Sequence, residues 1–156
     1  ELYAKQLAEN ESMRKSIKEA LEQHLPSLAE CGGFMYLHES MTDEEGENWP
    51  MAGVITGSCH NRGKLVRFGY VNVMEQTSHF LAEKPVRAHE FHYYDSDNNG
   101  ESCVAVKPVS GTSWTCIHED NRNWWGYPHL YYPSNPAFVE HFVQAARLYH
   151  RERNAK

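Results

Sequence analysis

The sequence predicts an α/β fold, with helices laid on a sheet, in one domain. Both ends of the chain repeat apolar residues at helical spacing, whereas the middle alternates apolar and polar residues as strands do. Between the first helices and the middle, the run AECGG at 29–33 indicates a strand that turns directly into a helix. The 156 residues can bury one core, and no repeat or linker divides them.

The first quarter of the chain is predicted to be helical. Residues 2–21 repeat apolar side chains at helical spacing, and Asn10 or Ser12 can cap the second of two helices. Pro26 ends that helix, because the residue before a proline disfavours the helical conformation. Residues 27–29 then form a short strand that leads to the cysteine turn.

The segment after the turn is predicted to continue as a helix. Phe34, Leu37 and Met41 recur at helical spacing. Residues 42–50 (TDEEGENWP) are acidic and read as a loop.

The middle of the chain is predicted to form a sheet. Strands are expected over 64–75, 86–94, 102–109 and 114–118. Gly69 is a candidate bulge, and residues 95–100 form a turn after which 102–109 pairs with the preceding strand. Residues 121–125 read as a polar and aromatic connector, and 135–151 as an amphipathic helix.

Cys31 is the candidate nucleophile. Gly32 and Gly33 allow a tight strand-to-helix turn, and the amide N–H groups of the first helical turn lack intrahelical acceptors. Such groups lower the pKa of a neighbouring thiol and can stabilise an oxyanion. The alternative is a buried structural cysteine beside a Gly-Gly turn.

His129 is the candidate base for this thiol. It lies in an aromatic, strand-like run at 125–132, just before the proline-containing segment 133–136. The carboxyl end of a strand is where open α/β sheets gather reactive groups. The alternative is a histidine packed among tyrosines.

Two other patterns are rejected as functional motifs. Residues 57–64 (GSCHNRGK) resemble a phosphate loop, but the spacing is wrong and Leu65 stands where a magnesium-binding hydroxyl belongs, so a surface turn is expected. His89 and His92 are separated by an odd number of positions and would lie on opposite faces of a strand, so they are not expected to share a metal ion.

Composition narrows the function classes. The formal charge is −6 with both signs intermixed, which argues against a nucleic-acid partner. No apolar run approaches the length of a membrane span, so no membrane partner is expected. The four cysteines form no C-x-x-C pair, which favours reduced thiols and a cytoplasmic location.

Three segments carry a resemblance to a known family. AECGGFMYL, RAHEFHYY and GYPHLYYPSNPAF, in that order, resemble the carboxyl-terminal class I glutamine amidotransferase domain of cobyrinic acid a,c-diamide synthases, in the cobyric-acid-synthase-like branch. The resemblance implies a flavodoxin-like sheet flanked by helices that lacks its N-terminal βα units. It also implies that residues 1–156 are the C-terminal portion of this domain, with an upstream ATP-binding synthase domain absent.

The resemblance further implies a chemistry. Cys31 would attack the side-chain amide of glutamine, His129 would move the protons, and the Gly32 N–H would donate to the oxyanion. Many relatives carry a Glu two residues after the histidine, where this chain has Tyr131, which leaves a Cys-His dyad with Glu90 as a candidate orienting acid. No metal or cofactor is expected in this chain; ATP and Mg²⁺ belong to the missing synthase domain.

The ammonia would amidate the side-chain carboxylates of a cobyrinate-type tetrapyrrole in cobalamin biosynthesis. Two alternatives stay open: ammonia supply to another acceptor, such as nickel-sirohydrochlorin or a cell-wall precursor, and a non-catalytic α/β module. The missing units predict low activity of the isolated piece. They also predict an open sheet edge that favours self-association, so a homodimer is a candidate assembly.

Overall fold

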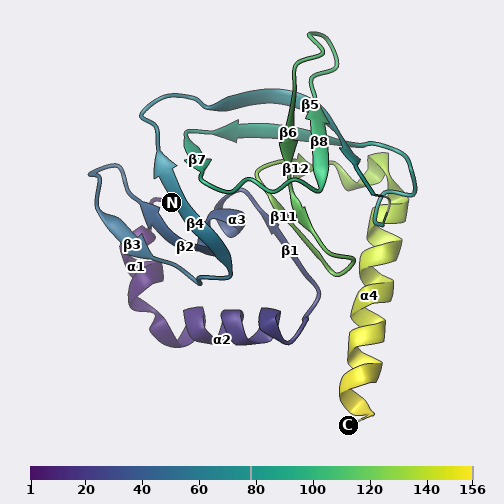
Figure 1. Ribbon diagram of the computed structural model, residues 1–156, viewed down its shortest axis with the longest axis horizontal. Helices are drawn as coiled ribbons and strands as arrows, with labels where there is room; N and C mark the ends of the chain where they lie inside the picture. Colours follow the sequence, from purple (N-terminus) through teal and green to yellow (C-terminus); the bar gives the residue numbers. More distant parts are fainter. Residues whose placement is uncertain (78, 156) are drawn as a thin grey trace.

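The computed structural model describes residues 1–77 and 79–155 as a mixed α/β structure (Figure 1). The helices are α1 Ala4–Glu9, α2 Glu11–Glu22, α3 Gly32–Tyr36, the 3₁₀ helix η1 Tyr132–Ser134 and α4 Pro136–Asn154. The strands are β1 Ser27–Glu30, β2 His38–Thr42, β3 Asn48–Pro50, β4 Ile55–Asn61, β5 Arg67–Glu75, β6 Val86–His92, β7 Tyr94–Ser96, β8 Cys103–Val106, β9 Ser113–Cys116, β10 His118–Glu119, β11 Asn123–Gly126 and β12 His129–Leu130.

The strands of the described residues form three sheets. Their orders are β1-β11-β10, β12-β6-β5-β8-β9 and β3-β2-β4-β7. The pairs β1–β11 and β2–β4 are parallel, and the remaining pairs are antiparallel. The predicted mixture of helices and strands is therefore confirmed, with the strands divided among several short sheets.

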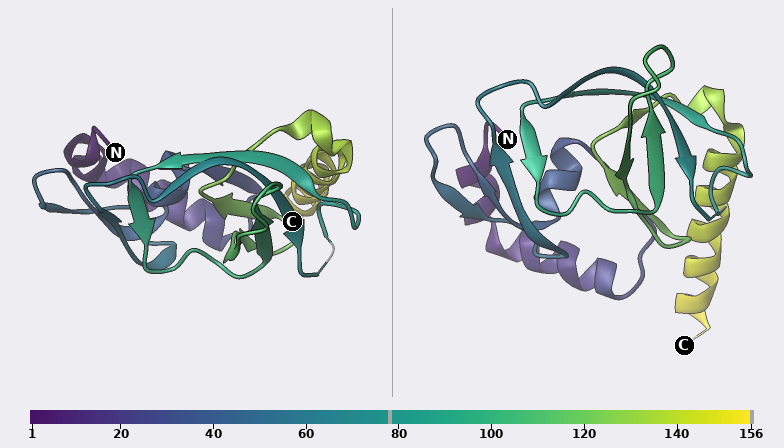
Figure 2. Two further views of the ribbon diagram at one scale, coloured as in Figure 1. Left: turned by 90° about the horizontal axis from the view of Figure 1, so that it is seen from above. Right: turned by 45° about the horizontal axis from the view of Figure 1, so that its top comes forward.

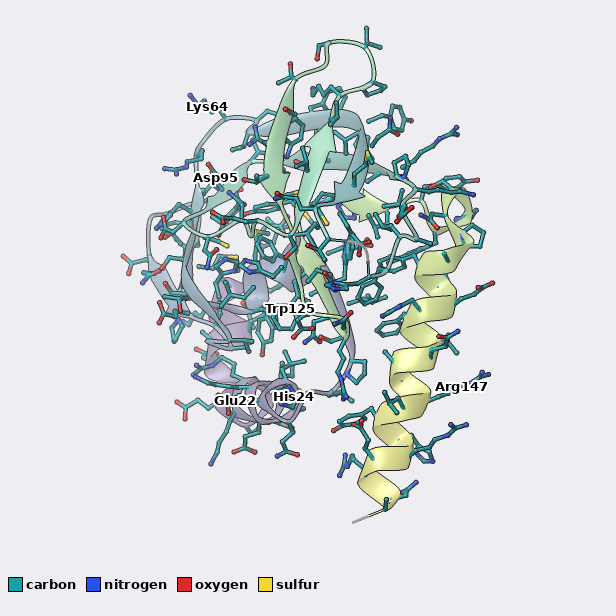
Figure 3. The ribbon with its side chains drawn as sticks, turned by 45° about the vertical axis from the view of Figure 1, so that its right-hand side comes forward. Glu22, His24, Lys64, Asp95, Trp125 and Arg147 are labelled. Carbon is teal, nitrogen blue, oxygen red and sulfur yellow. The ribbon has the colours of Figure 1, made fainter. Side chains whose placement is uncertain are left out.

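The parallel pair β1–β11 lies between two hydrophobic cores. Successive side chains of a strand point to opposite faces. Ala29 and Trp125 accordingly pack on one core, and Leu28 and Trp124 on the other. Figure 3 shows Trp125 in the interior of the molecule. Packing of the half-buried β1 against a core on each face holds the strand in place, and with it the turn that follows Glu30.

The two long helices cover opposite parts of the molecule. α2 runs beneath the N-terminal strands, and α4 runs along the far side of the chain, so the two termini lie well apart (Figures 1 and 2). The predicted cap of α2 is confirmed at Asn10, whose side-chain oxygen accepts the Met13 N–H at 3.2 Å. The predicted amphipathic helix at the C-terminal end is confirmed as α4, with Phe138 and Ala145 buried.

The helix predicted to continue through Met41 is wrong beyond Tyr36. α3 spans five residues, and the chain then enters β2, which pairs in parallel with β4. Met41 is buried in the first core, as the helical pattern predicts, but it reaches this core from a strand and not from a helix. Pairing with a distant strand has therefore overridden the local spacing.

The connector predicted at 121–125 is also wrong, because β11 is the central strand between β1 and β10. Its partner β1 begins 96 positions earlier, at Ser27, which is paired with Asn123. Local pattern could not show this pairing. The adjacent Trp124 and Trp125 were the sequence signal for a strand here, since two large apolar side chains on alternate faces fit a strand that packs on both sides.

Three further expectations in the middle of the chain need correction. Residues 57–61 belong to β4, so the turn begins only after Asn61. Gly69 has φ +108°, yet the β5–β6 register continues through it without a bulge. β8 pairs with β5 and not with the strand before it, because the chain between β6 and β8 leaves as β7 for another sheet.

Within residues 1–77 and 79–155, no helix combines the length and the apolar character needed to cross a membrane.

Candidate active site

Cys31 sits on a strained turn between β1 and α3. Its backbone has φ 48° and ψ −108°, a conformation that non-glycine residues rarely adopt. The turn is held on both sides: the Cys31 N–H donates to the Gly126 carbonyl at 2.9 Å, and the Cys31 carbonyl accepts the Met35 N–H at 2.9 Å. Such strain persists only where neighbouring structure enforces it, and it is frequent at functional sites.

Cys31 is also the most accessible thiol of the chain. All four cysteines are free and described; Cys31 is half-buried, whereas Cys59, Cys103 and Cys116 are buried. Burial raises the pKa of Cys59 and of Cys116 to about 12. These buried thiols are poor nucleophiles, so the accessibility expected of a nucleophile belongs to Cys31.

The expectation of a lowered Cys31 pKa is wrong. Burial raises the pKa of this thiol, and the nearby Glu1 carboxylate raises it further, while a hydrogen bond from the Gly32 backbone lowers it by less. α3 has five residues, so few aligned peptide dipoles act on the sulfur. Glu1 lies close to the turn, with its Oε2 3.6 Å from the position of a Cβ built on Gly32.

His129 lies beside the residue that precedes the cysteine. Its Nδ1 is 3.7 Å from Oε2 of Glu30, and the side chain is half exposed on β12. Cys31 follows Glu30 directly in the chain, and His129 lies beside the Glu30 carboxylate, but the two candidate residues line different pockets. The described residues include no hydrogen bond between the thiol and the imidazole, and such bonds often tighten only when substrate is bound.

Glu90, the acid suggested from the sequence, lies away from His129. Its carboxylate is 2% exposed and accepts hydrogen bonds from Trp114 Nε1 at 3.2 Å and from His92 Nε2 at 3.0 Å. The carboxylate next to His129 is Glu30, to which the sequence reasoning assigned no role. The available signal was an acidic residue in a short strand immediately before the cysteine.

Cys31 and His129 open onto two surface pockets. Cys31 lines one of ≈ 740 Å³ together with Arg62, Asp43 and His92. His129 lines another of ≈ 1240 Å³. The first pocket presents charges of both signs beside the thiol, which suits a zwitterionic amino acid.

His89 and His92 lie on opposite sides of β6, as their odd separation predicts. His89 contacts the exposed rings of Phe68 and Tyr70, whereas His92 is buried and stacks on Tyr127 with ring centroids 3.9 Å apart. Over the described part of the chain, no group of three His, Cys, Asp or Glu side chains is arranged to hold a metal ion.

Comparison with known proteins gives a consistent result. Residues 1–137 match the family of CobB/CobQ-like glutamine amidotransferase domains. The chain is 39% identical over 126 residues to the cobyrinate a,c-diamide synthase of Caldanaerobacter subterraneus subsp. tengcongensis, covering 77% of this chain and 28% of that protein. It is 33% identical over 153 residues to the cobyrinate a,c-diamide synthase of Salmonella typhimurium, covering 94% and 33%.

A solved structure supports the fold. The chain is similar to a crystal structure described as a glutamine amidotransferase, with a TM-score of 0.60 and 15% identity, covering 90% of this chain and 71% of that one. The expected α/β amidotransferase fold is confirmed by this likeness. The chain spans about a third of the length of the curated relatives that it matches.

Proposed function

The chain belongs to the family of CobB/CobQ-like glutamine amidotransferase domains, and from this membership we propose that it hydrolyses glutamine with Cys31 and His129. The ammonia released would serve the amidation of carboxylates on a cobyrinate-type tetrapyrrole. The observation that carries the proposal is the strained, half-buried Cys31 at the end of β1, one residue from the carboxylate that faces His129.

The first half of the reaction forms a thioester. The Cys31 sulfur attacks the side-chain carbonyl carbon of glutamine while His129 takes the thiol proton. The carbonyl oxygen becomes an oxyanion, to which the Gly32 N–H donates. The carbon–nitrogen bond then breaks, and His129 gives its proton to the leaving nitrogen, which departs as ammonia.

The second half restores the enzyme. His129 takes a proton from water, whose oxygen attacks the thioester carbon. The carbon–sulfur bond breaks, the proton returns to Cys31, and glutamate leaves. Because burial raises the pKa of the Cys31 thiol, the thiol is mostly protonated at neutral pH. A base is therefore needed in the attacking step itself, and in this proposal His129 supplies it.

His92 does not suit the same role, although it lines the pocket of Cys31. Its Nε2 faces the Glu90 carboxylate at 3.0 Å and its Nδ1 faces the Tyr94 carbonyl at 2.6 Å. Both ring nitrogens are therefore directed at acceptor oxygens, and neither is free to accept the thiol proton.

The names of the relatives support a tetrapyrrole as the proposed acceptor. The similar proteins named cobyrinate a,c-diamide synthase favour a tetrapyrrole over a cell-wall precursor. ATP and Mg²⁺, which would activate the acceptor carboxylate, belong in this proposal to a separate synthase domain. Residues 57–61 lie in β4 and offer no phosphate-binding loop for ATP.

The glutaminase step can be tested with the purified chain and three variants. Glutamate release from glutamine is measured, and hydroxylamine is added to convert a thioester into γ-glutamyl hydroxamate. We expect Cys31→Ser to abolish both products and His129→Asn to lower kcat by roughly 10²–10⁴-fold, the usual contribution of a general acid–base.

His89→Asn is the matched control, because His89 is paired with His129 across β6 and β12 on the same face. It should retain its activity within about twofold, a change too small for the loss of a general base. Hydroxamate formation by Cys31→Ser, or an equal loss in the two histidine variants, would overturn the assignment. A wild-type chain that is folded but forms no hydroxamate would overturn the proposed activity itself.

A further inference from the structure

We propose that Glu30 is the positioning residue for the catalytic histidine, and that Tyr132 holds the Glu30 carboxylate in place for this task. The proposal rests on the proposed function and completes its site with two residues to which no role has been given. It explains how an exposed imidazole is kept in one orientation on β12.

The two oxygens of Glu30 have different partners. Oε1 accepts the Tyr132 hydroxyl at 2.7 Å and the Leu130 N–H at 3.3 Å, whereas Oε2 lies 3.7 Å from Nδ1 of His129. Two donors on one oxygen fix the plane of the carboxylate. The other oxygen is left directed at the imidazole.

Tyr132 is suited to be a permanent donor. Burial raises the pKa of its hydroxyl, and the hydrogen bond to Glu30 raises it further, so the hydroxyl stays protonated at working pH. Its ring packs on Phe138, with centroids 5.5 Å apart, and Phe138 is fully buried in the second core. The orientation of Glu30 is therefore tied to the core through Tyr132.

Oε2 of Glu30 lies 3.7 Å from Nδ1, beyond a direct hydrogen bond in this structure, and we propose that in the working site it closes on the ring and selects the tautomer of His129. An oxygen that can only accept favours the form in which Nδ1 carries the proton. The other nitrogen, Nε2, then has a free lone pair for the thiol proton. Without the carboxylate, both tautomers and several ring orientations compete.

No alternative acid is close in the sequence. Residues 129–139 contain neither Asp nor Glu, and Glu90 is bound to other partners. Glu30 precedes Cys31 directly, so the residue that faces the imidazole is the chain neighbour of the candidate nucleophile. The short strand β1 is half-buried and packs against a core on each face, which holds Glu30 in place.

The test compares Glu30→Gln and Tyr132→Phe with the wild-type chain. Gln keeps the shape of Glu but carries an NH₂ group that can donate to Nδ1 and select the wrong tautomer. We expect Glu30→Gln to lower kcat for glutamine by roughly 10- to 100-fold, a smaller loss than removal of the base itself, with KM nearly unchanged. Tyr132→Phe should give a smaller loss in kcat, and Glu30→Asp a partial rescue.

¹⁵N NMR of the histidine rings supplies a readout that a purely structural role would not move. The His129 signal, assigned by its absence in His129→Asn, should report an Nδ1–H tautomer in the wild type and a shift toward Nε2–H in Glu30→Gln. Glu152→Gln is the matched control, since Glu152 is an exposed carboxylate on α4 paired with Arg122.

The outcomes separate the two proposals. If His129→Asn lowers activity strongly but Glu30→Gln leaves both kcat and the tautomer unchanged, the role of Glu30 is refuted and the dyad stands. If His129→Asn has no effect, the proposed function fails whatever Glu30 does. A thermal melt of each variant identifies loss of fold. If Glu30→Gln unfolds, Tyr132→Phe, which keeps the aromatic ring on Phe138, decides by kcat and by the His129 tautomer.

Discussion

Replacing Gly100 by Ala should destabilise the fold far more than the same change at Gly111. Both glycines have a left-handed backbone, with φ +79° and +72°. A Cβ at Gly111 would meet no atom within 4 Å, whereas a Cβ at Gly100 would overlap the Ile117 carbonyl and lie 2.6 Å from the His118 nitrogen. Comparison of the two alanine variants therefore separates the cost of a left-handed backbone from the cost of a steric clash.

The expected magnitudes follow from these two terms. A left-handed backbone costs a non-glycine residue about 1–2 kcal/mol, and both variants bear that cost. Overpacking adds about 1–3 kcal/mol, and only Gly100→Ala bears it, because the atoms it meets are backbone and cannot rotate away. Gly100→Ala should therefore cost about 2–5 kcal/mol out of a total stability of about 5–15 kcal/mol.

Urea unfolding followed by circular dichroism measures the difference. With a slope of about 1–3 kcal/mol per molar urea, the midpoint of Gly100→Ala should lie roughly 1 M below that of Gly111→Ala. Glutaminase activity should fall with it, because Ile117 packs against Gly126, whose carbonyl accepts the Cys31 N–H. Equal midpoints for the two variants would refute the steric reasoning.

Two further predictions concern the thiol and the first long helix. Because burial and then Glu1 raise the Cys31 pKa, alkylation of Cys31 by iodoacetamide should be slow at neutral pH, and its rate should rise only above the ordinary cysteine pKa of about 8.5. Glu1→Gln should move that rise in rate to lower pH. A rise centred below about pH 8.5 in the wild-type chain would contradict this account. Folding favours the neutral thiol, so its contribution to stability is present below about pH 8.5 and is lost as the pH rises through the raised value. Asn10→Ala should lower the free energy of unfolding by about 1 kcal/mol, because it removes the cap on the Met13 N–H, whereas Asn10→Asp should retain the cap. Equal melting temperatures of the two variants would show that the cap contributes nothing.

Sequence reasoning succeeded where one short segment carries the whole signal. The run AECGG suffices to predict the turn, although the residue that takes the left-handed backbone is Cys31 and neither of the glycines. The helical spacing of α2 and α4 and the alternation of β5 and β6 are equally local, and these elements were predicted close to their observed bounds.

It failed where the structure depends on distant partners. β11 was taken as a connector because its partner β1 is almost a hundred residues away. Glu30 shows the same limit within the site, because its neighbours Leu130 and Tyr132 lie 100 and 102 positions further along the chain. The sign of the Cys31 pKa shift was wrong because burial and Glu1 outweigh the dipole of so short a helix.

Labelling with a chloroketone analogue of glutamine, followed by peptide mapping, tests most directly whether Cys31 is the nucleophile of a glutamine site. The account predicts stoichiometric modification of Cys31, competition by glutamine, and much slower modification in His129→Asn. Modification of Cys59, Cys103 or Cys116 in the folded chain, with Cys31 left unmodified, would contradict it.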